Sequence, residues 1–212
     1  MANHANMRLY TSATSPYGRI VRVVIRELGL LDRIEEIVPV TRQADSPFYD
    51  LNPSGRIPFL VLPDGTGFEG SGLICDYLDA LDGTPRLSAP PDDTTWTYQR
   101  FEQSALAMMD GMAVWRRELR RPEEDRSAEI LAHEAARAAR CVAHWASQTE
   151  HPLMTCDLNR VQIIVAAALE MSRATPTFTW RDAHPALAAW LAPISQRKSM
   201  VDTRPDAPIG IA

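Results

Sequence analysis

The chain has 212 residues, of which 45% are hydrophobic and 23% charged, so it suits one large domain or two small ones and is too apolar for wholesale disorder. Its 22 basic and 27 acidic residues give a net charge of −5, which argues against nucleic acid or an anionic membrane as a partner. Three scattered cysteines, no long apolar run and no signal-peptide pattern argue against secreted, zinc-ribbon and membrane proteins, and we expect a cytoplasmic one.

The amino-acid composition changes near residues 82–94, a stretch that contains Pro85, Pro90 and Pro91. The first 94 residues hold eight of the ten glycines and six alanines, whereas the rest of the chain holds 22 alanines. Glycine among β-branched residues favours short strands and turns, and alanine favours helices. We therefore predict two domains of different class, joined by a stiff connector at residues 82–94.

Seven short elements in the order β-α-β-α-β-β-α are predicted for the first domain, residues 7–81. The first helix begins at Pro16, because proline suits a first helical turn, and it ends at Gly29. The strands are expected at residues 8–12, 34–40, 59–62 and 68–69, and the helices at residues 16–28, 46–51 and 71–81.

The second domain, residues 95–205, is predicted to be entirely helical. Pro122 ends its first helix, since proline cannot continue one. The fold class is therefore α/β followed by all-α, a small mixed unit and a helical bundle. Apolar residues repeat at helical spacing over residues 95–121, 127–148, 159–173 and 185–196.

Ser15 stands where the first strand gives way to the first helix, in the sequence Thr-Ser-Pro-Tyr-Gly-Arg at residues 14–19. Its hydroxyl is expected close to the unpaired backbone N–H groups and the positive end of the helix dipole. That location suits an anion, and a thiolate is an anion. The simpler interpretation, an ordinary serine cap, stays open.

Pro58 stands directly before the apolar strand at residues 59–62. Because proline cannot donate to a strand ladder, it marks either a strand start or a special turn. A cis bond between Ile57 and Pro58 would turn the backbone N–H and C=O of Ile57 outward, where they pair with a peptide-like ligand. The trans form remains the default for such a bond.

Ser71 is predicted to cap the helix at residues 71–81, with Glu69 and Gly70 before it. Backbone N–H groups at such a helix start suit a ligand carboxylate, and the neighbouring acid suits an ammonium group. As a bare pattern this is also what an ordinary helix cap looks like.

These three segments, in this order and on this frame, resemble the amino-terminal thioredoxin-like domain of cytosolic glutathione S-transferases. Asp110-Gly111-Met112, followed by the Arg/Glu-rich residues 116–123, looks like the first long helix of bacterial members. Residues 155–163 resemble the family's capped core helix, and residues 184–191 resemble the helix after it. These motifs, in register over roughly residues 7–205, identify the chain as a member of this superfamily, similar to bacterial serine-type members.

The resemblance implies a role for each segment. In serine-type members a hydroxyl at the first turn of the first helix donates a hydrogen bond to the glutathione sulfur, and Ser15 occupies that position. Ile57 would pair through its backbone with the cysteinyl part of glutathione, with Pro58 cis. Ser71 and the N–H groups around it would bind the γ-glutamyl carboxylate, and Arg56 would reach the glycyl carboxylate.

One departure from the family pattern bears on glutathione binding. The family usually has Glu or Asp immediately before the serine, whereas Gly70 stands there and the acid, Glu69, is one residue earlier. A shift of one residue on a strand turns a side chain to the opposite face. Either the turn bulges and returns Glu69 to the site, or the γ-glutamyl ammonium is held less well.

The pocket for a second substrate is expected on the first helix after the connector. Met108, Met109, Met112 and Trp115 form an adaptable apolar stripe there, although most such stripes are core. Met108, Met112 and Trp115 are the residues expected to line the pocket. Four arginines follow around Glu118, and a solvated face stabilised by ion pairs is favoured over recruitment of an anion. These arginines are Arg116, Arg117, Arg120 and Arg121.

Three functions fit these residues and this resemblance. The favoured one is transfer of the glutathione thiolate to small apolar electrophiles, with Ser15 as the catalytic residue. Tyr10, Ser12 and Thr14 are its rivals as the partner of the thiol; Tyr10 is expected to pack inside its strand, and Ser12 is the more serious competitor. The second is a non-catalytic module that binds glutathione or a protein. The third, a glutathione-dependent reductase, needs a cysteine where Ser15 stands. The resemblance implies a homodimer, a role in detoxification and no cofactor besides glutathione as co-substrate, and the histidines lack the spacing of metal ligands.

Overall fold

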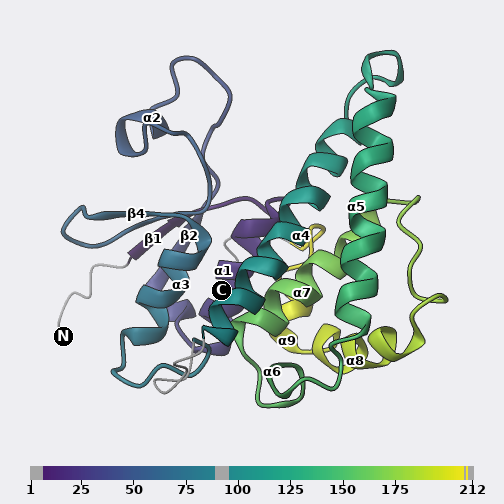
Figure 1. Ribbon diagram of the computed structural model, residues 1–212. Coiled ribbons are helices and arrows are strands. Elements are labelled where there is room, and N and C mark those ends of the chain that lie inside the picture. Colours follow the sequence, from purple (N-terminus) through teal and green to yellow (C-terminus); the bar gives the residue numbers. More distant parts are fainter. Residues whose placement is uncertain (1–6, 89–95, 208, 210–212) are drawn as a thin grey trace. The chain divides into compact units, whose positions relative to one another are not determined.

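A computed structural model of the chain describes residues 7–88, 96–207 and 209, and its contacts divide the chain into two compact units (Figure 1). The first unit comprises residues 1–86 together with residues 198–212, and the second comprises residues 87–197. Most of the predicted connector, from residue 89 on, lies outside the described residues, as does the predicted helix start at residue 95. Within the described part of the chain, no helix is both long and apolar enough to cross a membrane.

The first unit is built on a four-stranded mixed sheet with the strand order β2-β1-β3-β4. Strand β1 runs parallel to β2 and antiparallel to β3, and β3 runs antiparallel to β4. The strands are β1 (Met7–Tyr10), β2 (Ile34–Ile37), β3 (Phe59–Val61) and β4 (Gly67–Glu69), and the helices are α1 (Pro16–Glu27), α2 (Phe48–Leu51) and α3 (Ser71–Ala80), with a 3-10 turn at Leu31–Arg33. The predicted thioredoxin-like order of elements is therefore confirmed.

Helix α1 has the boundaries that its sequence predicts. Ser15 caps it, Pro16 is its first residue, and Gly29 follows it with a φ of +70°, a conformation that glycine adopts without strain. Its apolar face, which includes Ile20 and Val24, is buried, and α1 packs against α3. This packing fixes the helix that carries Ser15.

The second unit is helical, as predicted, and is centred on a helix that is buried along its whole length. That helix is α7, and every residue from Arg160 to Glu170 is buried. Helix α4 packs against both α5 and α7, and α8 packs against α7. The helices are α4 (Thr97–Leu119), α5 (Ala128–Ala146), α6 (Pro152–Thr155), α7 (Arg160–Glu170) and α8 (Pro185–Ser195), with 3-10 turns at Glu123–Asp125 and Met171–Ala174.

The last described segment of the chain folds against the first unit. Helix α9 (Lys198–Val201) packs on α1, where Met200 and Thr203 are buried. The predicted helical domain includes residues 198–205, whereas the contacts group these residues with the first unit. A segment of four helical residues carries too little periodicity to reveal such a return from the sequence.

Candidate functional site

The strand register brings the three predicted segments to one end of the sheet. Tyr10 at the end of β1 lies opposite Phe59 at the start of β3, and Phe59 lies opposite Glu69 at the end of β4. The segments that leave or enter the sheet at these points are residues 11–15, 57–58 and 70–71. Residues that are far apart in the sequence therefore come together at the same end of the sheet.

Ser15 is the cap of α1. Its φ of −77° and ψ of 117° are extended, and its Oγ accepts a hydrogen bond of 3.0 Å from the backbone N–H of Gly18. The side chain is 9% exposed, so it lies at the border between core and surface. The ordinary cap is therefore present, and the hydroxyl proton finds no acceptor among the described residues.

Thr11 lies beneath this turn. Its Oγ1 is fully buried and has no hydrogen-bond partner among the described residues. A Cβ added to Gly18 would come within 2.1 Å of this oxygen and 3.2 Å of Ser15 Oγ. Gly18 is therefore the residue that lets the first turn of α1 approach the end of β1. Sequence reasoning weighed Tyr10, Ser12 and Thr14 beside Ser15 but missed this contact.

The peptide bond between Ile57 and Pro58 is cis, as the resemblance implied. The loop before it is held by Asn52, whose side-chain amide donates to the Arg56 carbonyl at 2.9 Å and whose side-chain oxygen accepts from Ser54 N–H at 3.2 Å. The Arg56 side chain is exposed, and Ile57 is half-buried against an aromatic cluster that contains Tyr10. Burial of Tyr10 in that cluster disfavours it as the partner of a thiol.

Gly70, and not Ser71, is the cap residue of α3, which corrects the sequence prediction. Gly70 has a φ of +93°, and its carbonyl accepts from Ile74 N–H, so Ser71 becomes the first residue of the helix. A serine at that position has helical dihedrals and cannot fold back as a cap does, because a cap residue has non-helical dihedrals. The Ser71 side chain is 8% exposed.

Glu69 is exposed at the end of β4, where its Oε1 accepts a hydrogen bond of 2.6 Å from Ser54 Oγ. The ring of Phe68, its neighbour on the strand, packs on Tyr77 of α3. Because successive strand residues face opposite ways, Glu69 points away from α3. Its pairing with Phe59 is regular, so β4 shows no bulge at this residue.

The three side chains predicted to line an electrophile pocket are buried. Met108 and Met112 are each 1% exposed and Trp115 is 4% exposed, and the Trp115 ring meets Phe178 edge-on at 5.8 Å. In this state the stripe packs as core. A pocket bounded by these three residues stays a prediction.

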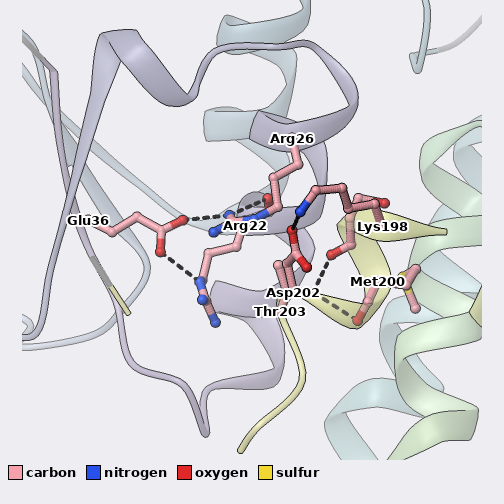
Figure 2. Close-up of polar contacts among 8 residues, drawn as sticks. Arg22, Arg26, Glu36, Lys198, Met200, Asp202 and Thr203 are labelled. Carbon is pink, nitrogen blue, oxygen red and sulfur yellow. Dashed lines mark hydrogen bonds and ion pairs between the residues drawn. The ribbon is translucent and has the colours of Figure 1, made fainter. Parts of the chain in front are cut away.

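A polar cluster on the face of α1 that lies opposite Ile20 and Val24 connects this helix to β2 and to the C-terminal segment. Figure 2 shows Arg22 and Arg26 reaching the same carboxylate, Glu36, with N–O distances of 2.9 and 2.7 Å. Burial lowers the pKa of the Arg22 guanidinium, and the charge of Glu36 opposes that shift. One turn after Ser15, Arg19 donates to the Met200 carbonyl at 3.0 Å.

Thr203 completes the return of the chain by donating to the Ser199 carbonyl at 2.8 Å, and Ser199 in turn donates to Glu27 of α1. Figure 2 also shows the ion pair between Lys198 and Asp202 on the exposed side of this segment. The sequence offered one signal for these contacts, the arginines on the polar face of α1. Among the described residues, no three or more His, Cys, Asp or Glu gather as metal ligands.

Comparisons with known proteins agree with this fold. A profile described as "Glutathione S-transferase, N-terminal domain" matches residues 9–86. A glutathione transferase family member from Pseudomonas fluorescens Pf-5, solved with bound glutathione, is 31% identical, with 96% of this chain and 100% of that chain covered and a TM-score of 0.83. A glutathione S-transferase from Methylobacillus flagellatus KT, solved with glutathione bound, is 28% identical over 94% of this chain and 100% of that chain, with a TM-score of 0.83.

A curated relative has a similar extent. It is the uncharacterized GST-like protein YibF of Escherichia coli (strain K12), 26% identical over 203 residues, which are 94% of this chain and 98% of that protein. The likeness in all three cases spans both units. The likeness therefore extends over 94–96% of this chain.

Proposed function

The chain belongs to the glutathione S-transferase superfamily, and on that premise we propose that it binds glutathione and conjugates its thiolate to small apolar electrophiles. The observation that supports this most directly is the setting of Ser15, whose oxygen accepts from Gly18 while its proton is free to be donated. A serine hydroxyl has one donor and two acceptor sites, so capping a helix and binding a sulfur are compatible. The site at this end of the sheet would then activate the thiol without a metal or a general base.

The energetics of this proposal are sufficient. A free thiol has a pKa of about 8.5, and lowering it by about two units requires about 2.7 kcal/mol of preference for the thiolate. A hydrogen bond to a charged group contributes about 1.5–3 kcal/mol. The helix terminus adds about 0.3–1 kcal/mol, and up to about 2 kcal/mol where it is partly buried. Ser15 and α1 together therefore account for the activation.

The remaining roles follow from the same premise. The backbone of Ile57 would pair with the cysteinyl residue of glutathione, and Arg56 would reach its glycyl carboxylate. The N–H groups of Ser71 and its neighbours at the start of α3 would bind the γ-glutamyl carboxylate, since the first N–H groups of a helix lack intrahelical partners. Because Glu69 points away from α3 and β4 has no bulge there, the γ-glutamyl ammonium would be held less well than in relatives that carry the acid directly before the serine.

A non-catalytic binding module is the second candidate. It is favoured by the hydrogen bond from Ser54 to Glu69, because this bond engages the carboxylate that would otherwise bind the γ-glutamyl ammonium. A reductase is disfavoured because no cysteine stands in the first turn of α1: Cys75 is buried in α3, and Cys141 and Cys156 belong to the second unit. A homodimer, a role in detoxification and a cytoplasmic location stay predictions from the family resemblance.

Two measurements on the purified chain separate these candidates. Calorimetric titration with glutathione tests binding, and release of chloride from chlorodinitrobenzene tests transfer. In that reaction the thiolate sulfur bonds to the ring carbon, the carbon–chlorine bond breaks and chloride leaves with the electron pair. Binding together with conjugation supports the transferase, and binding without conjugation supports a glutathione-binding module. Absence of binding rejects the transferase and leaves a module that binds protein.

Ser12 and Ser15 are distinguished by single substitutions. Ser15→Ala is expected to abolish conjugation while Ser12→Ala retains it. The opposite result would make Ser12 the hydrogen-bond partner of the glutathione thiol. The Ser12 carbonyl accepts from Ser15 N–H at 3.2 Å, and its side chain is half-buried in the same turn.

A further inference from the structure

The arginines at the end of α4 differ in whether their charge is matched. Arg121 pairs with Glu118 at 3.5 Å and donates to the Asp125 carbonyl at 2.9 Å. Glu118 is also engaged by Ser127 N–H at 2.6 Å. Arg116 and Arg120, by contrast, form no ion pair and no side-chain hydrogen bond with any residue that the structure describes. Of the four arginines predicted to form a face of ion pairs, Arg121 is therefore the only one with an ion pair to a described residue.

Arg116 is unusual among the arginines because it is half-buried. Every other buried or half-buried arginine in residues 7–88 and 96–207 has a partner: Arg22 and Arg26 share Glu36, and Arg160 binds Glu102 through a second contact of 3.0 Å. Burial lowers the pKa of the Arg116 guanidinium, and the charge of Arg120 lowers it further, with no carboxylate opposing. Taking a charge out of water without a partner is costly, so a ligand that supplies the missing anion gains affinity.

The position of Arg116 on the helix relates it to the proposed pocket. Met108, Met112, Arg116 and Arg120 follow one another at intervals of four residues, so each lies one turn from the next on adjoining parts of one face. Side chains of a helix tilt toward its N-terminus, which directs Arg116 back toward Met112. The row thus changes from apolar thioethers to two guanidinium groups.

We infer that Arg116 and Arg120 bind a carboxylate on the electrophilic substrate, so that the preferred second substrate is an apolar electrophile with an acidic end. This inference rests on the proposed function. A guanidinium presents its N–H groups in a planar fork that matches a carboxylate with two parallel hydrogen bonds. The carboxylate of such a substrate meets the arginines at the end of the row, beyond the two methionines, which are each 1% exposed and pack as core.

The test compares chlorodinitrobenzoate with chlorodinitrobenzene, two electrophiles with the same leaving group. The wild-type chain is expected to have a KM about tenfold lower for the benzoate, because one charge-assisted contact contributes about that factor. Arg116→Met, which keeps length and loses charge, is expected to raise the KM for the benzoate about tenfold while leaving the KM for chlorodinitrobenzene unchanged. Arg117→Met changes the exposed neighbouring residue and is expected to alter neither.

Equal KM values for the two electrophiles in the wild-type chain, or an equal change of both in Arg116→Met, would overturn the inference. Binding of the unreactive dinitrobenzoate, measured by calorimetry against dinitrobenzene, keeps it testable if conjugation fails altogether. Dinitrobenzoate binding that weakens about tenfold in Arg116→Met supports the anion site even where the transferase proposal fails. Absence of that binding in a chain that conjugates both electrophiles rejects the anion site alone.

A fold control accompanies these measurements. Arg116→Met removes a half-buried charge without a described partner, so its thermal unfolding is expected at or above the wild-type temperature. Arg120→Met is expected to weaken benzoate binding by a smaller factor, since Arg120 is exposed and its interactions are screened by water. Loss of benzoate binding in Arg117→Met but not in Arg116→Met would place the anion on the other side of the helix and contradict the inference.

Discussion

The backbone of Gly18 and the hydroxyl oxygen of Ser15 are joined by a hydrogen bond of 3.0 Å that closes the first turn of α1. The same glycine lies so close to Thr11 that a Cβ would meet Thr11 Oγ1 at 2.1 Å. The position of the Ser15 hydroxyl therefore depends on a glycine three residues later and on a threonine before it in the chain.

Gly18→Ala is expected to destabilise the first unit and to lower conjugation. Overpacking of this kind costs about 1–3 kcal/mol, and the methyl group can be accommodated only by moving the turn that carries Ser15. The double variant Thr11→Ala with Gly18→Ala removes the clashing oxygen and is expected to recover stability, since alanine is favoured over glycine in a helix by about 1 kcal/mol. Urea unfolding of the wild-type chain, the two single variants and the double variant measures the coupling between Thr11 and Gly18. Additive effects of the two substitutions on the free energy of unfolding would contradict this coupling.

Truncation of the chain after Arg197 is expected to destabilise the first unit. It removes the Met200 carbonyl that accepts from Arg19 and exposes the face of α1 on which α9 packs. Loss of a partner for a buried charged group costs about 2 kcal/mol or more. A chain ending at Ala207 is the matched control.

Hydrogen exchange in α1 is the appropriate measurement for this truncation. All five tryptophans lie between residues 96 and 190, within the second unit, so their fluorescence does not report on the first. Faster exchange in α1 of the chain ending at Arg197, with ordinary exchange in the control, is the expected result. Equal protection of α1 in both chains would show that the C-terminal segment does not stabilise the helix.

Glu36→Gln is expected to cost about 3–5 kcal/mol of unfolding free energy, because it leaves two buried guanidinium groups with a neutral partner. Both Arg22 and Arg26 rely on this carboxylate, which is 4% exposed. Glu35→Gln, on the exposed neighbouring residue of β2, is expected to change stability little. The two variants are compared by chemical denaturation and, separately, by hydrogen exchange in β2. Equal effects of Glu36→Gln and Glu35→Gln would contradict the role of Glu36.

The three cysteines are expected to react with an aromatic disulfide reagent in a fixed order. Cys156 is exposed and reacts first, and Cys75, 1% exposed, reacts only on unfolding. Burial raises the pKa of the Cys141 thiol, so at a given pH less of it is thiolate and it reacts after Cys156. The rate at Cys141 is expected to rise with pH beyond the range of an ordinary thiol.

Cys156→Ser isolates the slower reaction at Cys141 and serves as its control. A raised pKa also means that the folded chain holds this proton more tightly than the unfolded chain. The associated stability is therefore present at neutral pH and is lost as pH rises through the shifted pKa. Reaction of Cys141 before Cys156 would contradict the order.

Local rules were sufficient to predict most of the first unit. Proline at the first turn, glycine after the last turn and a regular apolar face define α1, and its cap follows from the same residues. Strand β2 was expected to run to Val40 but ends at Ile37. The reason is its partner: β1 ends at Tyr10, and Ile37 already accepts from Thr11 N–H, so nothing is left to pair with residues 38–40.

Long-range contacts explain what the sequence could not reveal. The return of α9 to α1 depends on a backbone carbonyl, that of Met200, which no side-chain pattern marks. The start of α3 at Ser71 depends on the positive φ of Gly70, and a serine after a glycine suggests a cap equally well. The burial of Met108 and Met112 is set by the packing of α4 on its neighbours, which periodicity alone cannot distinguish from a pocket wall.

The proposed role of Ser15 in activating the thiol must be separated from its structural role as a helix cap. Ser15→Ala removes both, at a cost to stability of about 0.5–2 kcal/mol. Ser127, which caps α5 with nearly the same backbone (φ −79°, ψ 112°), offers a matched variant, Ser127→Ala, that removes a cap alone. Ser15→Asp keeps a cap but places a negative charge beside the sulfur, so it is expected to fold and to disfavour the thiolate.

The most direct measurement is a pH titration of the thiolate absorbance of glutathione bound to each of these chains. The wild-type chain and Ser127→Ala are expected to ionise the bound thiol about two pH units below its ordinary pKa, whereas Ser15→Ala and Ser15→Asp return it toward about 8.5. A bound thiol that titrates at its ordinary pKa in the wild-type chain, or at the same lowered pKa in Ser15→Ala, would contradict the account.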